Sequence, residues 1–237
     1  MNCYEIRKYR IERMTIIFIA RWPENFTCCI FILDKNERSY YYKFMTKGED
    51  TKQIILKAGL GITSQVGLES VTIGNLANAT NMSKSGLFAH FQSKEKLQIE
   101  ILNYAAQLFA EEVVRPSLRT EAGIPRIRAL VDNWVSWASK QKGGCIFVSA
   151  STEFSDRHGK VRECLLRQQE EWINTLNRIA RSAIKAGDFK EGIHCEQFAF
   201  DLYSLLLGFH YYHKLLQDSE TQKHQNNALD RLLDNFR

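Results

Sequence analysis

The sequence predicts an all-α protein, and three observations support this fold class. Only three prolines occur in 237 residues. Apolar residues recur at helical spacing from Thr51 onward. Between Thr72 and Leu97, serine and threonine stand where they would cap short helices. We expect an atypical N-terminal extension over residues 1–44, a three-helix domain over 45–92 and a larger helical domain over 93–237.

Residues 1–44 differ from the rest in composition. They are rich in β-branched and aromatic residues, end in ERSYYYKF and lack helical periodicity. A hairpin is one interpretation of this pattern. The other is that the segment is disordered or foreign to the native protein.

Net charge gives little information about partners. The formal charge is +5, but residues 1–47 hold nine Lys or Arg against five Asp or Glu, which leaves +1 for residues 48–237. A nucleic-acid function would therefore have to rest on local placement of basic residues.

Six cysteines without CxxC pairs or histidines at zinc-finger spacing indicate neither a metal site nor a redox pair. We expect reduced thiols, a cytoplasmic location and no cofactor. No apolar run reaches the roughly 20 residues that span a bilayer.

The stretch from Thr72 to Leu97 predicts two short helices joined by a tight turn, and the start of a third. Thr72 can cap a helix that buries Leu76 and Ala77, and Ser83 can cap the next, which buries Leu87 and Phe91. A preceding helix from Thr51 to Val66 would support the pair. The repeat of Ile54, Ala58, Ile62 and Val66, with Ile55 beside it, suggests its buried face. Such a three-helix unit is the usual helix-turn-helix.

The outer face of this pair suits a DNA groove. Short hydrogen-bonding side chains at a helix N-terminus can meet phosphates or base edges, and glycine permits close approach. The expected DNA-binding residues are Thr72, Ser83, Lys84, Ser85, Gly86, Phe88, His90 and Lys94. An ordinary helical hairpin with a solvated face is the alternative on spacing alone.

The same residues resemble the tetracycline-repressor (TetR) family. The family pattern has glycine, an apolar residue and an aromatic, then histidine and phenylalanine, then a serine-lysine-glutamate cap. It is matched by Gly86, Leu87 and Phe88, then His90 and Phe91, then Ser93, Lys94 and Glu95. Phe88 departs from the tyrosine that is usual there. The resemblance implies a helix-turn-helix that binds operator DNA, and a fourth helix, beginning after Ser93, that connects it to a ligand cavity.

Beyond Pro125 we expect longer helices over Ile127–Lys140, Val161–Ala186 and Cys195–Leu216. The last is apolar nearly all round, so one face needs a covering partner, and a second copy of the chain would provide it. Leu206 and Phe209 are expected in that dimer contact. Burial within one chain is the alternative. A short segment, GGCIFVSASTEFSDRHGKVRE, also resembles one regulatory-domain subgroup of the same family.

An apolar or aromatic small molecule is the expected effector. Its cavity would draw on the aromatic residues of the larger domain, which are Trp134, Trp137, Phe147, Phe154, Trp172 and Tyr203. Core packing without a cavity is the alternative.

Other chemistry has weaker support in the sequence. A nucleophile and base could come from Cys145 or Cys164 with His158 or His194, although no local signature surrounds them. His210 and His213, with Asp201 or His194, could hold a metal. We expect neither an enzyme nor a metal site. The expected function is a homodimeric repressor released from a palindromic operator by its effector, and the alternative is a DNA-binding or interaction protein of the same fold without ligand response.

Overall fold

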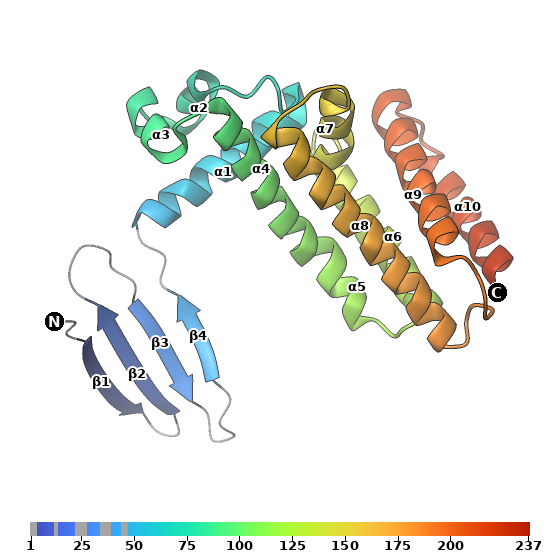
Figure 1. Cartoon of the computed structure of the whole chain (residues 1–237), viewed down its shortest axis with the longest axis horizontal. Coiled ribbons are helices and arrows are strands. Elements are labelled where there is room, and N and C mark those ends of the chain that lie inside the picture. Colours follow the sequence, from blue (N-terminus) through green and yellow to red (C-terminus); the bar gives the residue numbers. More distant parts are fainter. Residues whose placement is uncertain (1–3, 12–13, 22–27, 34–38, 44–46) are drawn as a thin grey trace. The chain divides into compact units, whose positions relative to one another are not determined.

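The computed structural model describes residues 4–11, 14–21, 28–33, 39–43 and 47–237, and it divides into two compact units, 1–55 and 56–237. The first unit contains a four-stranded antiparallel sheet in the order β1-β2-β3-β4 (Figure 1). Its strands are β1 (Tyr4–Ile11), β2 (Met14–Arg21), β3 (Cys28–Leu33) and β4 (Ser39–Lys43). Tyr4 pairs with Arg21, and Cys29 pairs with Lys43. The hairpin considered from the sequence is thus part of a larger meander, which β-branched and aromatic residues favour.

We predict that this sheet is dispensable, because its composition and periodicity differ from those of the helical part. A protein that starts at Met45 should fold, dimerise and bind DNA with affinity within about twofold of the full chain. Sedimentation and DNA titration of the two forms check this. Loss of dimerisation or of DNA affinity in the shorter form would refute it.

A three-helix head consists of α1 (Lys47–Val66), α2 (Ile73–Thr80) and α3 (Lys84–Phe91). Its core holds Leu68, Leu76, Leu87 and Phe91, all fully buried. The predicted caps are confirmed: the Thr72 and Ser83 hydroxyls accept bonds from the amides of Asn75 and Gly86. The sequence also predicted the break between the helices, where Asn81 adopts the left-handed conformation with φ 54°.

The buried face of α1 differs from the predicted one. Ile54 and Val66 are 63% and 53% exposed, whereas Leu56 and Leu60 are buried. A strict four-residue repeat drifts around a helix of 3.6 residues per turn, so it does not mark one face. Gly59 lies on the buried face, where a Cβ atom would stand 2.8 Å from Ile101 Cδ1. This glycine therefore allows α1 to pack closely against the fourth helix.

Helix α4 (Lys94–Phe109) runs from the head into the larger domain (Figure 1). Ser93 caps it as predicted, its hydroxyl accepting from the Lys96 amide. The helical path continues through Pro116, because a π-helical segment, η1 (Ala110–Val114), leads into α5 (Arg115–Arg119). Proline is tolerated there because it occupies the first turn of α5, where its missing N–H is not needed.

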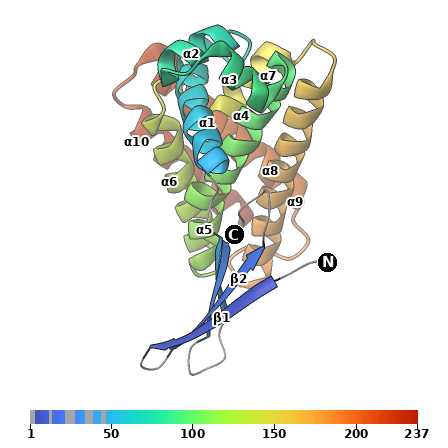
Figure 2. The same ribbon diagram turned by 90° about the vertical axis from the view of Figure 1, so that its left-hand side faces the viewer.

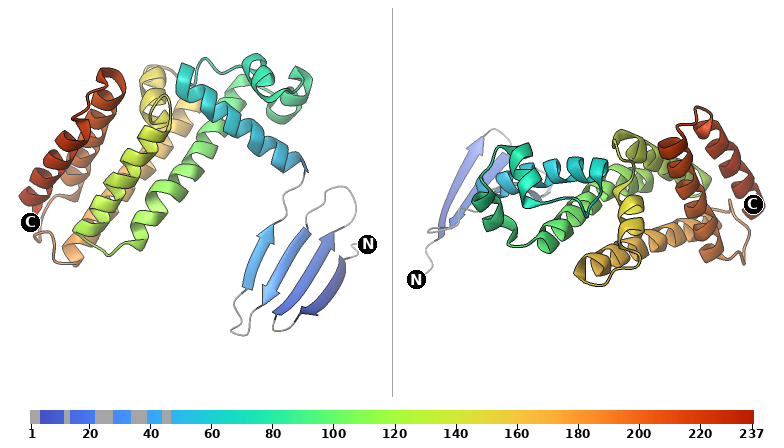
Figure 3. Two further views of the ribbon diagram at one scale, coloured as in Figure 1. Left: turned by 180° about the vertical axis from the view of Figure 1, so that it is seen from behind. Right: turned by 90° about the horizontal axis from the view of Figure 1, so that it is seen from above.

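The remaining helices are α6 (Ile124–Lys140), α7 (Ile146–Phe154), α8 (Lys160–Lys185), α9 (Cys195–Tyr211) with the π-helical η2 (Tyr212–Leu216), and α10 (Thr221–Phe236). Helix α8 packs between α4 and α9, and α9 packs against α10 (Figures 1 and 3). The fold class of the 47–237 part is all-α, as predicted. Helix α7 has 9 residues and begins at Ile146, before the STEF segment.

Within the described residues, no helix combines the length and apolar character needed to cross a membrane.

Candidate DNA interface and ligand cavity

Helix α3 presents the exposed face on which most predicted DNA contacts lie. Ser83, Lys84, Ser85 and Phe88 are exposed, and Phe88 shows 56% of its surface. His90 is half-buried, with its ring centroid 6.1 Å from that of Phe91. Thr72, at the start of α2, is exposed. Thr72 and residues Ser83 to Ser85 lie at the starts of α2 and α3, where backbone N–H groups favour anions, whereas Phe88 and His90 lie in the second half of α3.

Gly86 has a structural role that the sequence argument missed. A Cβ atom at this position would lie 3.1 Å from Ser83 Oγ, the atom that caps α3. A side chain at Gly86 would therefore require the Ser83 hydroxyl to shift by a few tenths of an ångström.

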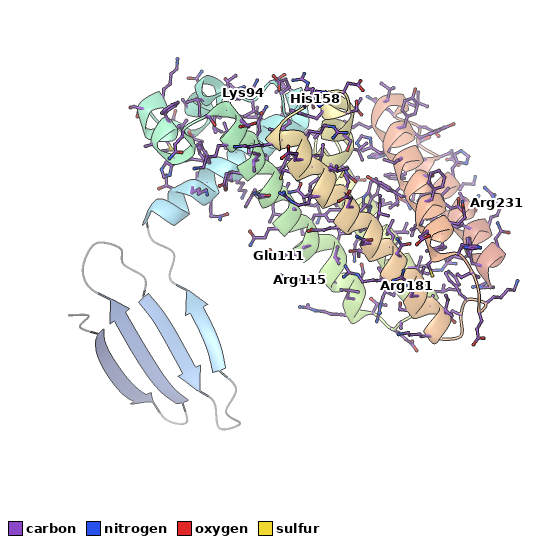
Figure 4. The ribbon with its side chains drawn as sticks, viewed as in Figure 1. Lys94, Glu111, Arg115, His158, Arg181 and Arg231 are labelled. Atoms are coloured by element: carbon purple, nitrogen blue, oxygen red, sulfur yellow. The ribbon has the colours of Figure 1, made fainter. Side chains whose placement is uncertain are left out.

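Lys94, an expected phosphate contact, is held by a carboxylate. Its Nζ lies 2.8 Å from Glu69 Oε1, and Arg157 contacts the other oxygen at 3.0 Å. The hydrogen bond from Lys94 is the main cause that lowers the pKa of Glu69, so Glu69 stays ionised. Figure 4 shows Lys94 at the start of α4 and His158, in the loop before α8, at the same end of the helical part. Sequence spacing could not reveal this pairing, since Glu69 lies 25 residues away.

We predict different salt dependences for the two lysines. Lys84→Ala should reduce the slope of log affinity against log salt by about one unit per subunit, because it removes one phosphate contact. Lys94→Ala should change the slope by less, because the Glu69 carboxylate already neutralises Lys94. Titration of operator and random DNA at several salt concentrations measures both. Equal slope changes would show that Lys94 leaves Glu69 to contact DNA.

A cavity of about 410 Å³ lies in the larger domain beside α4. Four of the six aromatic residues expected around a ligand line it: Trp134, Phe147, Trp172 and Tyr203. The lining is completed by Ala106, Phe109, Ala110 and Val114 from α4 and η1, by Cys145, and by Gln168, Gln169, Glu171, Thr175 and Arg178 from α8. The lining thus combines aromatic walls with several polar side chains, among them Glu171 and Arg178, and small-molecule sites commonly pair an apolar lining with placed polar groups.

Edge-to-face aromatic contacts hold the cavity wall. The Phe109 ring lies 5.0 Å from Trp172 and 5.7 Å from Phe147, measured between centroids. Tyr203 donates to Gln169 Oε1 at 2.7 Å, and burial raises the pKa of Tyr203, so its hydroxyl stays protonated. Gln169 in turn donates to the Phe147 carbonyl at 3.2 Å. The walls from α7, α8 and α9 are thus bonded to one another.

Two of the predicted ligand residues do not line this cavity. Trp137 is 1% exposed and packs edge-on against Phe109, behind the wall. Phe154 lies at the end of α7, where the Arg157 guanidinium stands 5.0 Å from its ring centroid. Both residues are aromatic members of the core, which sequence alone cannot separate from cavity residues.

The cysteines and histidines considered for catalysis or metal binding lack the surroundings that these roles need. Burial raises the pKa of Cys145, which keeps the thiol protonated and weakens it as a nucleophile. Among the residues that the structure describes, no group of three or more His, Cys, Asp or Glu is arranged to hold a metal ion. His213 stacks on Phe209 with centroids 5.2 Å apart, and burial lowers the pKa of His210.

Family models for "Bacterial regulatory proteins, tetR family" and "Tetracyclin repressor-like, C-terminal domain" match residues 55–101 and 123–229. The chain belongs to the TetR family. It is accordingly a TetR-family transcriptional regulator, which is a non-enzymatic role, and such regulators bind operator DNA.

Individual relatives are distant. The HTH-type transcriptional repressor DhaR of Mycobacterium sp. (strain GP1) is 23% identical over 145 residues, which cover 60% of this chain and 71% of DhaR. A TetR transcriptional regulator from Chloroflexus aurantiacus superposes with a TM-score of 0.71 at 22% identity, covering 80% of this chain and 96% of that one. The structure of AibR in complex with isovaleryl coenzyme A and operator DNA superposes with a TM-score of 0.63 at 20% identity. The match covers 76% of this chain and 97% of AibR. These structures share the TetR fold with this chain.

Proposed function

We propose that this TetR regulator is a homodimeric repressor that leaves a palindromic operator when an apolar or aromatic small molecule occupies the cavity beside α4. The aromatic cavity carries this proposal, because α4 forms one wall of it and begins at the head. AibR was solved with both a small molecule and operator DNA, which supports a comparable arrangement here. Thr72 and residues Ser83 to His90 of each subunit would contact one half-site in the major groove, with Lys94 in the head framework.

An apolar surface that a second copy could cover is exposed on α9 and the segment after it. Phe200 is 69% exposed and Leu207, one heptad later, is 39% exposed. Tyr211, Tyr212, Leu215 and Leu216 extend this apolar surface and are each about half exposed or more. Contiguous exposed apolar surface of this kind marks an association site, and a twofold axis would let each copy cover the other.

Leu206 and Phe209 belong to the core of one chain. They are 0% and 4% exposed, so the expectation that they form the dimer contact is wrong. Helical geometry explains the difference: residues seven apart share a face, and Phe200 and Leu207 lie on the side opposite the buried stripe.

Release of DNA by aromatic compounds tests the ligand response. With DNA selected in vitro by the protein, a releasing compound should change tryptophan fluorescence, since Trp134 and Trp172 line the cavity. Trp172→Phe should remove part of that signal, and Trp137→Phe, behind the wall, should preserve it. Releasing compounds that leave the fluorescence unchanged, or act equally on a Trp134→Ala, Trp172→Ala variant, would contradict this location. DNA binding that no aromatic compound alters would favour a regulator without ligand response.

A further inference from the structure

Glu153, at the C-terminal end of α7, holds the loop that connects α1 to α2. Its carboxylate accepts two backbone N–H groups, from Leu68 at 3.1 Å and from Glu69 at 2.8 Å. Hydrogen bonds to an ionised acceptor are stronger than neutral ones, and two parallel bonds also fix orientation. The larger domain thus holds this loop of the head through Glu153, and next to it through Arg157, which contacts the Glu69 carboxylate at 3.0 Å; both contacts are separate from α4.

The loop backbone is shaped to receive this carboxylate. Gly67 has a positive φ of 86°, and a Cβ atom there would stand 2.6 Å from Glu153 Oε1. Gly143, in the loop before α7, approaches the end of α1 so closely that a Cβ atom would overlap the Ser64 carbonyl. Helix α7 and the loop before it therefore touch the head at two places, and Figures 2 and 3 show α7 beside the end of α1.

The other end of α7 is at the ligand cavity. Cys145 and Phe147 line the cavity, and the Phe147 ring packs on Phe109 of α4. Helix α7 has 9 residues, and a helix of that size is about 13 Å long. A displacement of Phe147 by a bound molecule would therefore move Glu153 as part of one short, hydrogen-bonded element.

We infer that α7 transmits the state of the cavity to the head, and that Glu153 is the positioning residue that makes this connection. The inference rests on the proposed ligand response. Occupancy of the cavity shifts α7, the two hydrogen bonds to Leu68 and Glu69 weaken, and the head leaves the arrangement that fits DNA. If α4 alone connected the cavity to the head, replacing Glu153 would not change the effect of cavity occupancy on DNA binding.

A substitution that fills the cavity provides the test without a known effector. Ala106 lines the cavity, so Ala106→Phe is the probe of occupancy. Glu153→Gln is the uncoupling variant: it keeps the size of the side chain, but its amide N–H₂ would face a backbone N–H in place of one acceptor oxygen. The readout is the ratio of operator affinities with and without Ala106→Phe, because any effect of Glu153→Gln on basal affinity cancels in this ratio.

We expect Ala106→Phe to lower operator affinity at least tenfold in the parent protein and less than twofold in the Glu153→Gln background. Glu170→Gln, an exposed carboxylate on α8, is the matched control and should preserve the tenfold effect. Hydrogen exchange at the Leu68 and Glu69 amides should accelerate in Ala106→Phe and in Glu153→Gln, while the remaining head amides keep their protection.

Two results would overturn the role of α7, and only one of them would also overturn the proposed ligand response. An equal loss of operator affinity in both backgrounds would show that the cavity controls the head through α4, so the proposed function would stand without the α7 connection. No loss in either background would show that filling the cavity does not control DNA binding, and both the inference and the proposed ligand response would fall.

Discussion

Replacing Phe200 and Leu207 together by glutamate should convert the regulator to a monomer. Both side chains are exposed on one face of α9, and burying two carboxylates against the same surface of a second copy would be strongly unfavourable. A monomer brings one head to a two-part site, so operator affinity should fall by about a hundredfold or more. Sedimentation gives the oligomeric state, and DNA titration gives the affinity.

The chain offers a matched control on another helix. Leu166 and Ile173 on α8 are also seven residues apart and are 46% and 41% exposed. Their double replacement by glutamate introduces the same charge, yet it should leave a dimer with parental affinity. A dimer that survives in the α9 variant, or dissociates equally in the α8 variant, would place the interface elsewhere.

Phe88→Glu should abolish specific DNA binding while the fold and the dimer remain intact. Phe88 is 56% exposed on α3, so the head does not need it for packing. In the major groove, a carboxylate at this position would face the negative potential of the duplex, and like charges across an interface cost several kcal/mol, or about a hundredfold in affinity. Operator titration, a thermal melt and sedimentation measure the three properties.

Val66→Glu is the control for the added charge. Val66 is an exposed apolar residue of the same head, 53% exposed, but it lies at the end of α1 next to the Gly67 turn. Its replacement should lower operator affinity by less than about threefold. If the Phe88 variant binds its operator like the parent, α3 is not the helix that enters the groove.

The sequence predicted the head in detail because its information there is local. Thr72, Ser83 and Ser93 cap helices within three residues of their partners, and Leu87 and Phe91 face inward from one short helix. The repeat chosen for α1 misidentified its buried face, because positions four residues apart drift around a helix of 3.6 residues per turn. The close packing at Gly59 depends on Ile101 of another helix, which local sequence does not show.

The site was less predictable wherever its contacts join distant parts of the chain. The sequence around Lys94 indicates an unpaired cation, but in the folded chain Lys94 forms an ion pair with Glu69. Glu153 stands in a short segment that resembles a family subgroup, but its bonds to Leu68 and Glu69 span 85 and 84 residues. Burial of Leu206 and exposure of Phe200 likewise depend on how α9 packs against its neighbours.

Affinity for DNA with altered half-site spacing tests whether a homodimer binds a palindrome with both heads at once. If a homodimer places one α3 helix in each of two major grooves on the same side of the duplex, the half-sites stand about one helical turn apart, 10–10.5 base pairs. Inserting five base pairs between the half-sites of the selected palindrome turns one of them to the opposite side. We expect the affinity for the lengthened palindrome to fall by about a hundredfold, to the level of a single half-site. Equal affinity for the original and the lengthened palindrome would show that the heads bind independently and would contradict this expectation.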